Sequence, residues 1–247
     1  FLATLPCRAD ACAQRSDGTV LCATPGRDAG ARWVLPAALP VTDGGLDAPA
    51  WAPGSRVIAR DAREAWLDDG AAAPATSDRV RELAARAGEA RDIAFAFSAD
   101  TRYTWAADVV STVLAIVPGS PRASVLAEGR GRSVGSLPLG LPRLEPSGDT
   151  EVPSSRTVTV TVLDNATRVL RDGMTREVPA GKAAAAAIDR ALATVCPKSS
   201  GPADLVLLRV SPSVRWGKAI RIAASARHAC GGGGGATPVV LAIAPPQ

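Results

Sequence analysis

Apolar and polar residues alternate strictly in one stretch of the chain, where Val158, Val160 and Val162 are separated by threonines. A period of two is typical of a strand with one buried face. Asp164-Asn165 predicts a turn, and residues 167–171 predict a returning strand. This stretch therefore predicts a β-hairpin.

Helical spacing follows the hairpin. Four apolar positions recur along one face and Pro197 ends the pattern, and a second helix is predicted over residues 215–230, before a run of glycines. The inward positions are Ala184, Ile188, Leu192 and Val195 in the first helix, and Trp216, Ile220 and Ala223 in the second. Apolar runs at 205–210 and 239–243 predict strands, the first of them buried on both faces. The predicted order is β-β-α-β-α-β.

The same order recurs upstream, which indicates an internal repeat. At one constant spacing, Val57, Asp61, Leu67, Asp69 and Gly70 match identical residues of the later hairpin. The upstream strands are predicted over 57–60 and 64–67, then over a stretch with Ile93, Phe95 and Phe97, and finally over 123–127. The first upstream helix is predicted to start at Ser77 or Asp78 and to precede the third strand, with Val80, Leu83, Ala84 and Ala87 inward. The second precedes the last strand and contains Trp105, Val109, Val113 and Ile116. The segment from Asp100 to Trp105 aligns with Ser211 to Trp216, so the two tryptophans are predicted to be equivalent.

The fold class predicted is α/β (α+β), with two tandem small β-β-α-β-α-β sandwich domains, each a mixed sheet with two helices packed on it. Residues 1–55 form a cysteine-containing segment, 56–128 the first domain and 156–247 the second. Residues 129–155 are rich in Gly, Pro and Ser and show no periodicity, which predicts a linker.

Short motifs resemble the periplasmic domain of the ExbD/TolR family. In the second copy they are Asp172-Gly173, Val214-Arg215-Trp216-Gly217 and the glycine run from Gly231; in the first copy they are Asp69-Gly70 with Asp100, Tyr103 and Trp105. The likeness covers roughly two thirds of the chain and implies a periplasmic fold with a binding role. Family members have one such domain behind a membrane helix whose aspartate carries protons. Ser211 replaces the motif aspartate, and the resemblance does not transfer motor function.

Five cysteines suggest an oxidising compartment. Cys7, Cys12 and Cys22 lie in a segment with turn signals, and at least one local disulfide is expected there, with its pairing left open. Cys196 and Cys230 each end a predicted helix that leads into a parallel strand. Since both helix ends then lie at the same edge, a disulfide between them is predicted.

The single histidine, His228, excludes any site with two histidines and leaves one imidazole base. We expect His228 to be solvated or to interact with the end of its helix. Asp61, Asp68, Asp69 and Asp100 fall in predicted turns, and no serine-hydrolase, zinc-protease or P-loop motif is present. No catalytic residue, metal site or cofactor is therefore predicted.

Charge is unevenly distributed. Residues 156–247 hold nine Arg and three Lys against five acidic residues, a net of +7, so the remainder carries −3 of the total of +4. Arg215, Lys218 and Arg221 recur on one face of a helix. Such a face suits an anionic cell-wall polymer, lipid head groups or the acidic first copy, or is simply solvated. Few aromatic residues argue against nucleic acid.

Two functions from different classes follow. The leading hypothesis is a non-enzymatic periplasmic binding or scaffold module that offers an edge strand, with Val158, Val160 and Val162 on it, to a cell-envelope protein, to peptidoglycan or to a second copy. Arg215, Trp216, Lys218, Arg221 and Trp105 are the further candidate contacts. The rival is a secreted hydrolase with a carboxylate pair. No stretch is long enough to span a bilayer, and the start at Phe1 fits either a removed signal or anchor or an arbitrary boundary.

Overall fold

The computed structural model describes residues 12–15, 20–22, 33–47, 55–61, 63–68, 70–119, 121–129, 134–140, 156–181, 184–197, 201–231 and 237–243. Within these ranges the strands form one mixed sheet of 11 strands and a small sheet of three, with four helices. The predicted α/β class is confirmed. The small sheet has the order β2-β1-β3 and consists of β1 (Cys12–Arg15), β2 (Val20–Cys22) and β3 (Trp33–Leu35).

The large sheet contains two halves with the same succession of elements, except that the first half has one more strand at its end. The first half is β4 (Ser55–Arg60), β5 (Glu64–Leu67), β6 (Ala73–Pro74), α1 (Ser77–Ala87), β7 (Asp92–Phe97), α2 (Tyr103–Ile116), β8 (Arg122–Glu128) and β9 (Val134–Leu139). The second half is β10 (Thr157–Val162), β11 (Ala166–Arg171), β12 (Met174–Pro179), α3 (Ala184–Val195), β13 (Leu205–Val210), α4 (Trp216–Cys230) and β14 (Val239–Ile243). The strand order is β12-β11-β10-β13-β14-β9-β8-β7-β4-β5-β6.

Both halves place a three-strand antiparallel meander beside two parallel strands. β4 pairs parallel with β7 and β7 with β8, as β10 pairs with β13 and β13 with β14. The predicted β-β-α-β-α-β order is thus present in each half, with one further strand, β6 or β12, that the sequence patterns did not predict.

The sheet continues through the point where the halves meet. β9 pairs antiparallel with β8 along its length and joins β14 through Leu139 and Val239. One hydrophobic core also includes residues of both halves. Two separate small domains are therefore not confirmed, and β9 occupies part of the 129–155 range that was predicted to be a linker.

Backbone hydrogen bonds show which residues are equivalent in the two halves. Ser98 N donates to Arg60 O, and Ser211 N donates to Val162 O, so Arg60 corresponds to Val162. The sequence matches had instead aligned Val57 with Val160, which differs by one residue. A shift of one residue moves every side chain of a strand to the other face.

The burial of these strands shows that consequence. Val160 lies in the large core beneath the helices, as Ile58 does, whereas Val57 lies in a second cluster on the opposite face of the sheet. The repeat is therefore present, but the identities that suggested it do not join structurally equivalent positions.

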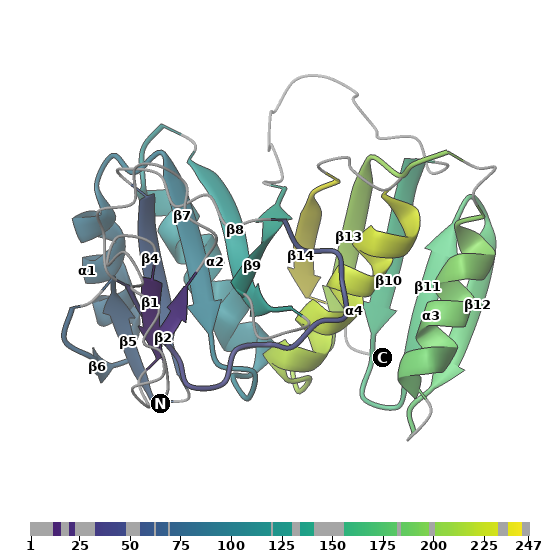
Figure 1. Cartoon of the computed structure of the whole chain (residues 1–247), viewed down its shortest axis with the longest axis horizontal. Coiled ribbons are helices and arrows are strands. Elements are labelled where there is room, and N and C mark those ends of the chain that lie inside the picture. Colours follow the sequence, from purple (N-terminus) through teal and green to yellow (C-terminus); the bar gives the residue numbers. More distant parts are fainter. Residues whose placement is uncertain are drawn as a thin grey trace, which may run out of the picture.

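The helices lie on opposite faces of the two halves. In the view of Figure 1, α3 and α4 lie in front of the second half, whereas α1 and α2 lie behind the first half. Residues 33–47 cover the other face of the first half, where Leu35 and Leu39 pack on Trp66 and Leu126. Trp66 Nε1 donates to Val34 O at 2.7 Å, which fixes this segment on the sheet.

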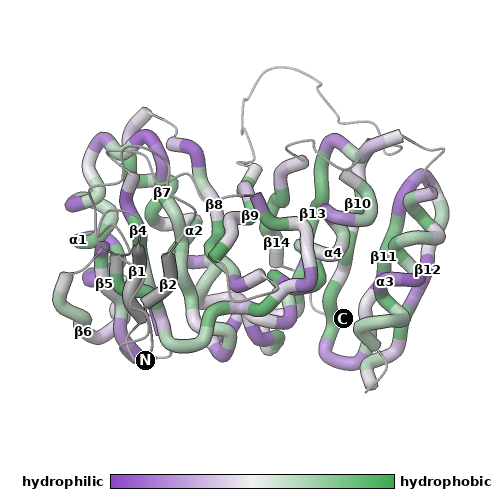
Figure 2. Tube along the Cα trace, viewed as in Figure 1, coloured by the Kyte–Doolittle hydropathy of each residue, from purple (hydrophilic) through white to green (hydrophobic). Residues whose placement is uncertain are grey.

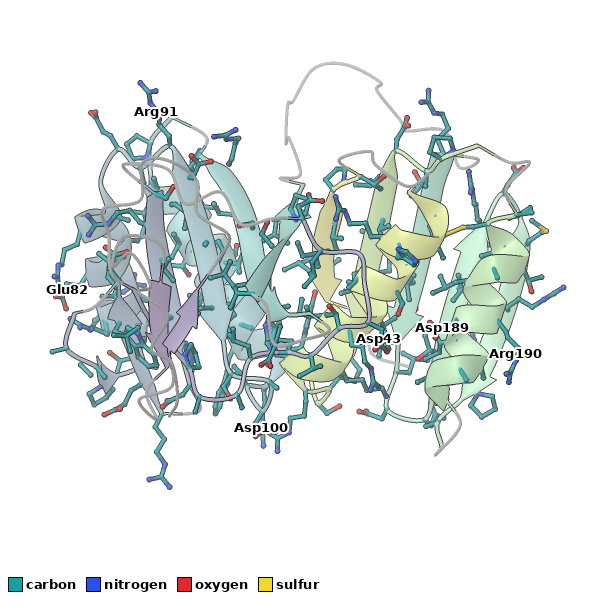
Figure 3. The ribbon with its side chains drawn as sticks, in the orientation of Figure 1. Asp43, Glu82, Arg91, Asp100, Asp189 and Arg190 are labelled. Atoms are coloured by element: carbon teal, nitrogen blue, oxygen red, sulfur yellow. A yellow bond between two sulfur atoms is a disulfide. The ribbon has the colours of Figure 1, made fainter. Side chains whose placement is uncertain are left out.

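Helices α2 and α4 begin side by side at one edge of the molecule, where Figure 3 labels Asp100. Tyr103 N donates to Val214 O at 2.9 Å, and Trp216 N donates to Thr101 O at 2.7 Å. The Tyr103 and Trp216 rings stack with centroids 5.8 Å apart. This reciprocal contact relates the two halves as a local pseudo-twofold pair.

The second half buries only one face of its strands. In β13 the buried residues are Val206, Leu208 and Val210, while the alternate residues are half-buried or exposed. The prediction that residues 205–210 are buried on both faces was wrong, because no described segment covers the second face as residues 33–47 do in the first half. Figure 2 shows the change from the hydrophobic β13 to the mixed β12 at the end of the sheet.

Candidate functional site

Strand β10 is not an edge strand. It lies between β11 and β13, and its residues Val158, Val160 and Val162 are fully buried. The prediction that these valines offer a binding edge was therefore wrong. The free edge of the second half is β12, in which Val178 is the one buried residue.

The backbone geometry of β12 identifies which groups face outward. Asp172 and Gly173 have φ values of 47° and 74° and form a two-residue turn between β11 and β12. The residues beside such a turn, Arg171 and Met174, form a hydrogen-bonded pair, and pairs alternate from there. Amide and carbonyl groups of Thr175 and Glu177 therefore point away from β11.

Pro179 ends the free edge because it has no amide hydrogen. The outward-facing backbone of β12 thus offers two donors, Thr175 N and Glu177 N, together with the carbonyl oxygens of the same two residues as acceptors. On the face away from the helices, Glu177 is paired with Arg168 of β11 at 2.8 Å. This edge is six residues long and carries both polar and apolar side chains.

The opposite edge of the sheet is different. It is formed by β6, which has two residues and ends at Pro74. A short strand with proline is a common means of blocking pairing with another chain. Of the two edges, only β12 suits the addition of another strand.

The basic residues of α4 serve partly in the fold. Arg215 Nη1 donates to Asp100 O at 2.6 Å, and Lys218 Nζ donates to Leu163 O at 3.3 Å. Arg221 is exposed. Arg215 and Lys218 therefore bind backbone carbonyls at the junction and at the end of β10, besides adding positive charge to this surface.

The two candidate tryptophans are not equivalent. Trp216 is the first residue of α4 and has no exposed surface, while Trp105 is the third residue of α2 and is 42% exposed. The structural counterpart of Trp216 is Tyr103. Trp216 is therefore a core residue that holds the halves together, and Trp105 alone is available to a ligand. Ile116, predicted to face inward, is also exposed.

The aspartates of the rival hydrolase hypothesis have structural partners. Asp61 Oδ1 accepts hydrogen bonds from the amides of Arg63 and Glu64 in the β4–β5 turn. Asp68 accepts from Val57 N and pairs with Arg56 at 2.9 Å. Asp100 lies in the turn before α2, and Asp69 lies outside the described residues.

A polar cluster that the sequence did not indicate lies at the carboxyl ends of β10 and β13. Ser213 Oγ donates to Asp164 Oδ1 at 2.5 Å, and Ser211 Oγ donates to Asp164 Oδ2 at 3.2 Å. These bonds tie two adjacent turns together. The exposed His228 is near the other end of α4, so it supplies no base to these serines.

The structure places Cys196 and Cys230 at disulfide distance, with Cα atoms 5.2 Å apart. Cys12 and Cys22 are direct partners in the β1–β2 ladder, whereas Cys7 lies outside the described residues. A disulfide fits an oxidising location outside the cytoplasm. Over the described ranges, no helix is long and apolar enough to cross a membrane, and no group of three or more His, Cys, Asp or Glu residues is arranged for a metal ion.

A cavity of about 590 Å³ lies in the first half, away from both β12 and the basic face of α4. It is formed at the carboxyl end of β4 by the first turns of α1 and one side of α2. Trp105 is the one candidate residue from the sequence that lines it. The arginines beside it gave no sequence signal, because their position depends on how α1 and α2 pack.

Comparison of the chain with protein-family models, with curated proteins and with solved structures finds no match.

Proposed function

We propose that this chain is a non-catalytic binding module of the cell envelope that captures an extended segment of a partner protein on strand β12. The observation that carries the proposal is the free edge of β12, with the amides of Thr175 and Glu177 directed outward. Strand addition of this kind takes its affinity from backbone hydrogen bonds and its specificity from alternate side chains.

The charges on β12 favour a different protein over a second copy of the chain. When two copies of β12 pair antiparallel and use both outward amides, either Arg176 lies opposite Arg176 of the other copy or Glu177 lies opposite Glu177 of the other copy. Like charges directly opposite each other destabilise a strand pair. A segment with an acidic residue opposite Arg176 avoids this repulsion, so we infer an acidic, extended partner segment.

Location outside the cytoplasm is part of the same proposal. The cysteine pair Cys196 and Cys230 supports an oxidising compartment. The resemblance of both halves to the ExbD/TolR periplasmic domain adds support through the shared hairpin-helix-strand-helix-strand order. Under this proposal the tandem arrangement leaves one half to bind through its edge, because the equivalent edge of the other half is the short β6.

The test uses the whole chain and a synthetic seven-residue peptide of alternating Val and Thr with one central Glu. Backbone amide shifts are followed by nuclear magnetic resonance during titration. We expect saturable shifts at Thr175 and Glu177. The variant Thr175→Pro/Glu177→Pro removes both outward donors without breaking the β11 ladder and should abolish binding.

The matched control is Thr175→Ala/Glu177→Ala, which changes the same side chains and keeps both amides. This variant should bind within about threefold of the parent affinity, since rim side-chain contacts contribute little. Loss of binding in the alanine variant, or shifts confined to the helices, would contradict strand addition at β12.

A further inference from the structure

The cavity of the first half contains a buried cation. Arg60, the last residue of β4, is 8% exposed and lines this space. Among the described residues its Nε has no hydrogen-bond partner and its guanidinium has no ion pair; the guanidinium carbon lies over the ring of Trp105, 5.4 Å from the ring centroid. Burial lowers the pKa of Arg60, and Asp108 and Asp61 oppose this effect through their charge.

A buried charge without a hydrogen-bonded partner is costly, so such groups in native proteins usually meet an ion or ligand. The ring of Trp105 stabilises a cation by about 1 kcal/mol, but it accepts none of the guanidinium's hydrogen bonds in the plane. Since Arg60 lines the cavity, an acceptor bound there can supply hydrogen bonds that the described residues do not.

The remaining walls also suit an anion. Arg63 adds positive charge, Arg81 lines the cavity while paired with Asp78 at 2.9 Å, and Thr76 and Ser77 bring the first turn of α1 to the cavity. The start of an 11-residue helix carries partial positive charge and unpaired amides. Asp108 is the one acidic residue in the lining, so positive charge predominates.

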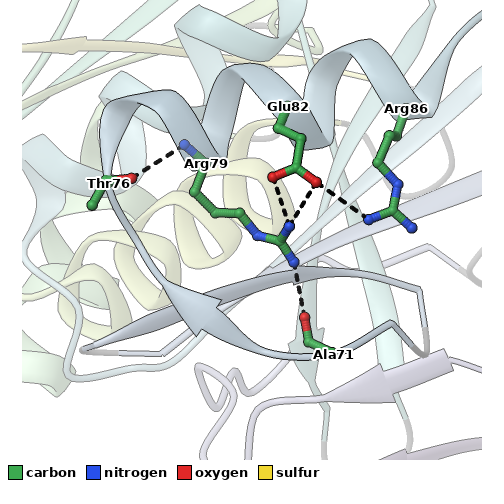
Figure 4. Close-up of polar contacts among 5 residues, drawn as sticks. All are labelled: Ala71, Thr76, Arg79, Glu82 and Arg86. Atoms are coloured by element: carbon green, nitrogen blue, oxygen red, sulfur yellow. Dashed lines mark hydrogen bonds and ion pairs between the residues drawn. The ribbon is translucent and has the colours of Figure 1, made fainter.

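A nearby arginine on α1 is already paired and is not part of this site. Figure 4 shows Arg79 bound to both oxygens of Glu82 at 2.8 Å and to Ala71 O at 2.9 Å. Its hydrogen bond is the main cause that lowers the pKa of the Glu82 carboxyl. Arg79 therefore fixes α1 in position, in contrast to Arg60.

The second half does not repeat this arrangement. The counterparts of Arg60, Trp105 and Asp108 are Val162, Lys218 and Arg221, from the equivalences that the turn hydrogen bonds define. Val162 is fully buried in the core. The buried arginine is thus not a requirement of the topology, since the equivalent strand end is apolar in the other half.

We propose that the cavity between α1 and α2 is a binding site for the oxyanion of a small molecule, a carboxylate or a phosphate, with Arg60 as the residue that contacts it. Trp105 forms one wall and holds the guanidinium plane, and the first turn of α1 faces the anion. The location agrees with the general tendency of parallel strands to bind ligands beyond their carboxyl ends.

The test titrates the whole chain with sodium acetate and, separately, with sodium phosphate, with sodium chloride holding the ionic strength constant. The indole Nε1–H of Trp105 and the Nε–H of Arg60 are followed by nuclear magnetic resonance. Saturable shifts with acetate alone identify a carboxylate site, and shifts with phosphate alone or with both identify a phosphate or general oxyanion site. No saturable shift with either ion overturns the proposal.

Two variants separate binding from structure. Arg60→Met should weaken the binding of the ion at least about tenfold, as expected for loss of a charged hydrogen bond. Arg102→Met is the matched control, because Arg102 also lies over Trp105, at 5.5 Å, but does not line the cavity; it should leave the affinity unchanged. Equal loss in both variants would overturn the assignment of Arg60.

If Arg60→Met does not fold, Asp108→Asn gives an independent result. Removal of the one negative charge in the lining should tighten anion binding and leave the fold intact. Weaker or unchanged anion binding in Asp108→Asn would count against an oxyanion site.

Discussion

The two halves share a topology and differ in what lies at the ends of their helices. In the first half, the first turns of α1 and one side of α2 surround a cavity lined by Arg60, whose Nε has no hydrogen-bond partner, and both faces of the sheet are covered. In the second half, the equivalent strand end is the buried Val162, and the far ends of α3 and α4 carry Cys196 and Cys230. The same topology thus forms the proposed binding cavity in one half and carries a disulfide in the other.

This difference has a physical basis. The first half gains a second hydrophobic cluster from residues 33–47, so it buries apolar surface on both faces of its strands. The described part of the second half has no such cover, and the residues that follow the helices of the first half, Gly88 and Val117, cannot form a disulfide. A disulfide stabilises a region with less burial, which is consistent with its position in the half that also exposes an edge strand.

The largest expected effect separates the two tryptophans that sequence similarity had paired. Trp216→Ala should destabilise the chain by about 3–5 kcal/mol, because a fully buried ring that contacts Tyr103 and Phe97 is lost. Trp105→Ala should cost about 1 kcal/mol or less, since that residue is 42% exposed and contributes mainly cation–π contacts. Urea unfolding followed by circular dichroism measures both values.

Equal losses in the two alanine variants would mean that Trp105 and Trp216 occupy equivalent environments after all. Trp216→Phe provides the control for ring size, and it should lose less than Trp216→Ala because Phe keeps an aromatic contact with Tyr103.

The next effect concerns the disulfide. Cys196→Ala/Cys230→Ala should destabilise the second half by about 2–4 kcal/mol, because the link closes a loop of 34 residues and restricts the unfolded chain. Urea unfolding is compared for the parent and the variant under oxidising conditions. In the double variant, amide hydrogen exchange should show faster opening of α3 and α4 than of α1 and α2.

Addition of a reductant is the internal control. It should lower the stability of the parent to that of the double variant and leave the double variant unchanged. A parent whose stability does not respond to reductant would show that the cysteines do not form a stabilising bond.

The order of elements could be predicted from periodicity, since β10, α3, α4 and β14 all lie where alternation or helical spacing indicated. The register of the repeat could not. Short hairpins of valine, aspartate and glycine match at several offsets, and only the hydrogen bonds of Arg60 and Val162 identify the true one. Strand β12 was missed because Met174 to Pro179 has no apolar alternation, as is usual for an exposed edge.

The cavity was beyond sequence reasoning for a different reason. Arg60 ends an apolar strand, where an arginine ordinarily points to solvent. Its burial results from Trp105 and the first turn of α1, which are far from it in the sequence. Patterns within one element do not show which side chains from separate helices meet.

The smallest expected effect tests whether the start of α1 is specially stabilised. Thr76 Oγ1 accepts a hydrogen bond from Arg79 N at 3.2 Å, as Figure 4 shows, whereas Arg102 and Arg215 give α2 and α4 no side-chain cap. Thr76→Ala should cost about 1 kcal/mol and should speed amide exchange at Arg79, because that amide loses its acceptor. Thr76→Ser keeps the hydroxyl and should restore most of the stability.

Exchange at the start of α4 should be unaffected by either substitution of Thr76, since Trp216 N is bound by Thr101 O of the other half. The start of α1 is therefore secured by its own threonine, whereas α2 and α4, the equivalent helices of the two halves, secure each other. A Thr76→Ala variant that destabilised α4 as much as α1 would show instead that the halves unfold as one unit, and that the contact between Tyr103 and Val214 transmits the loss.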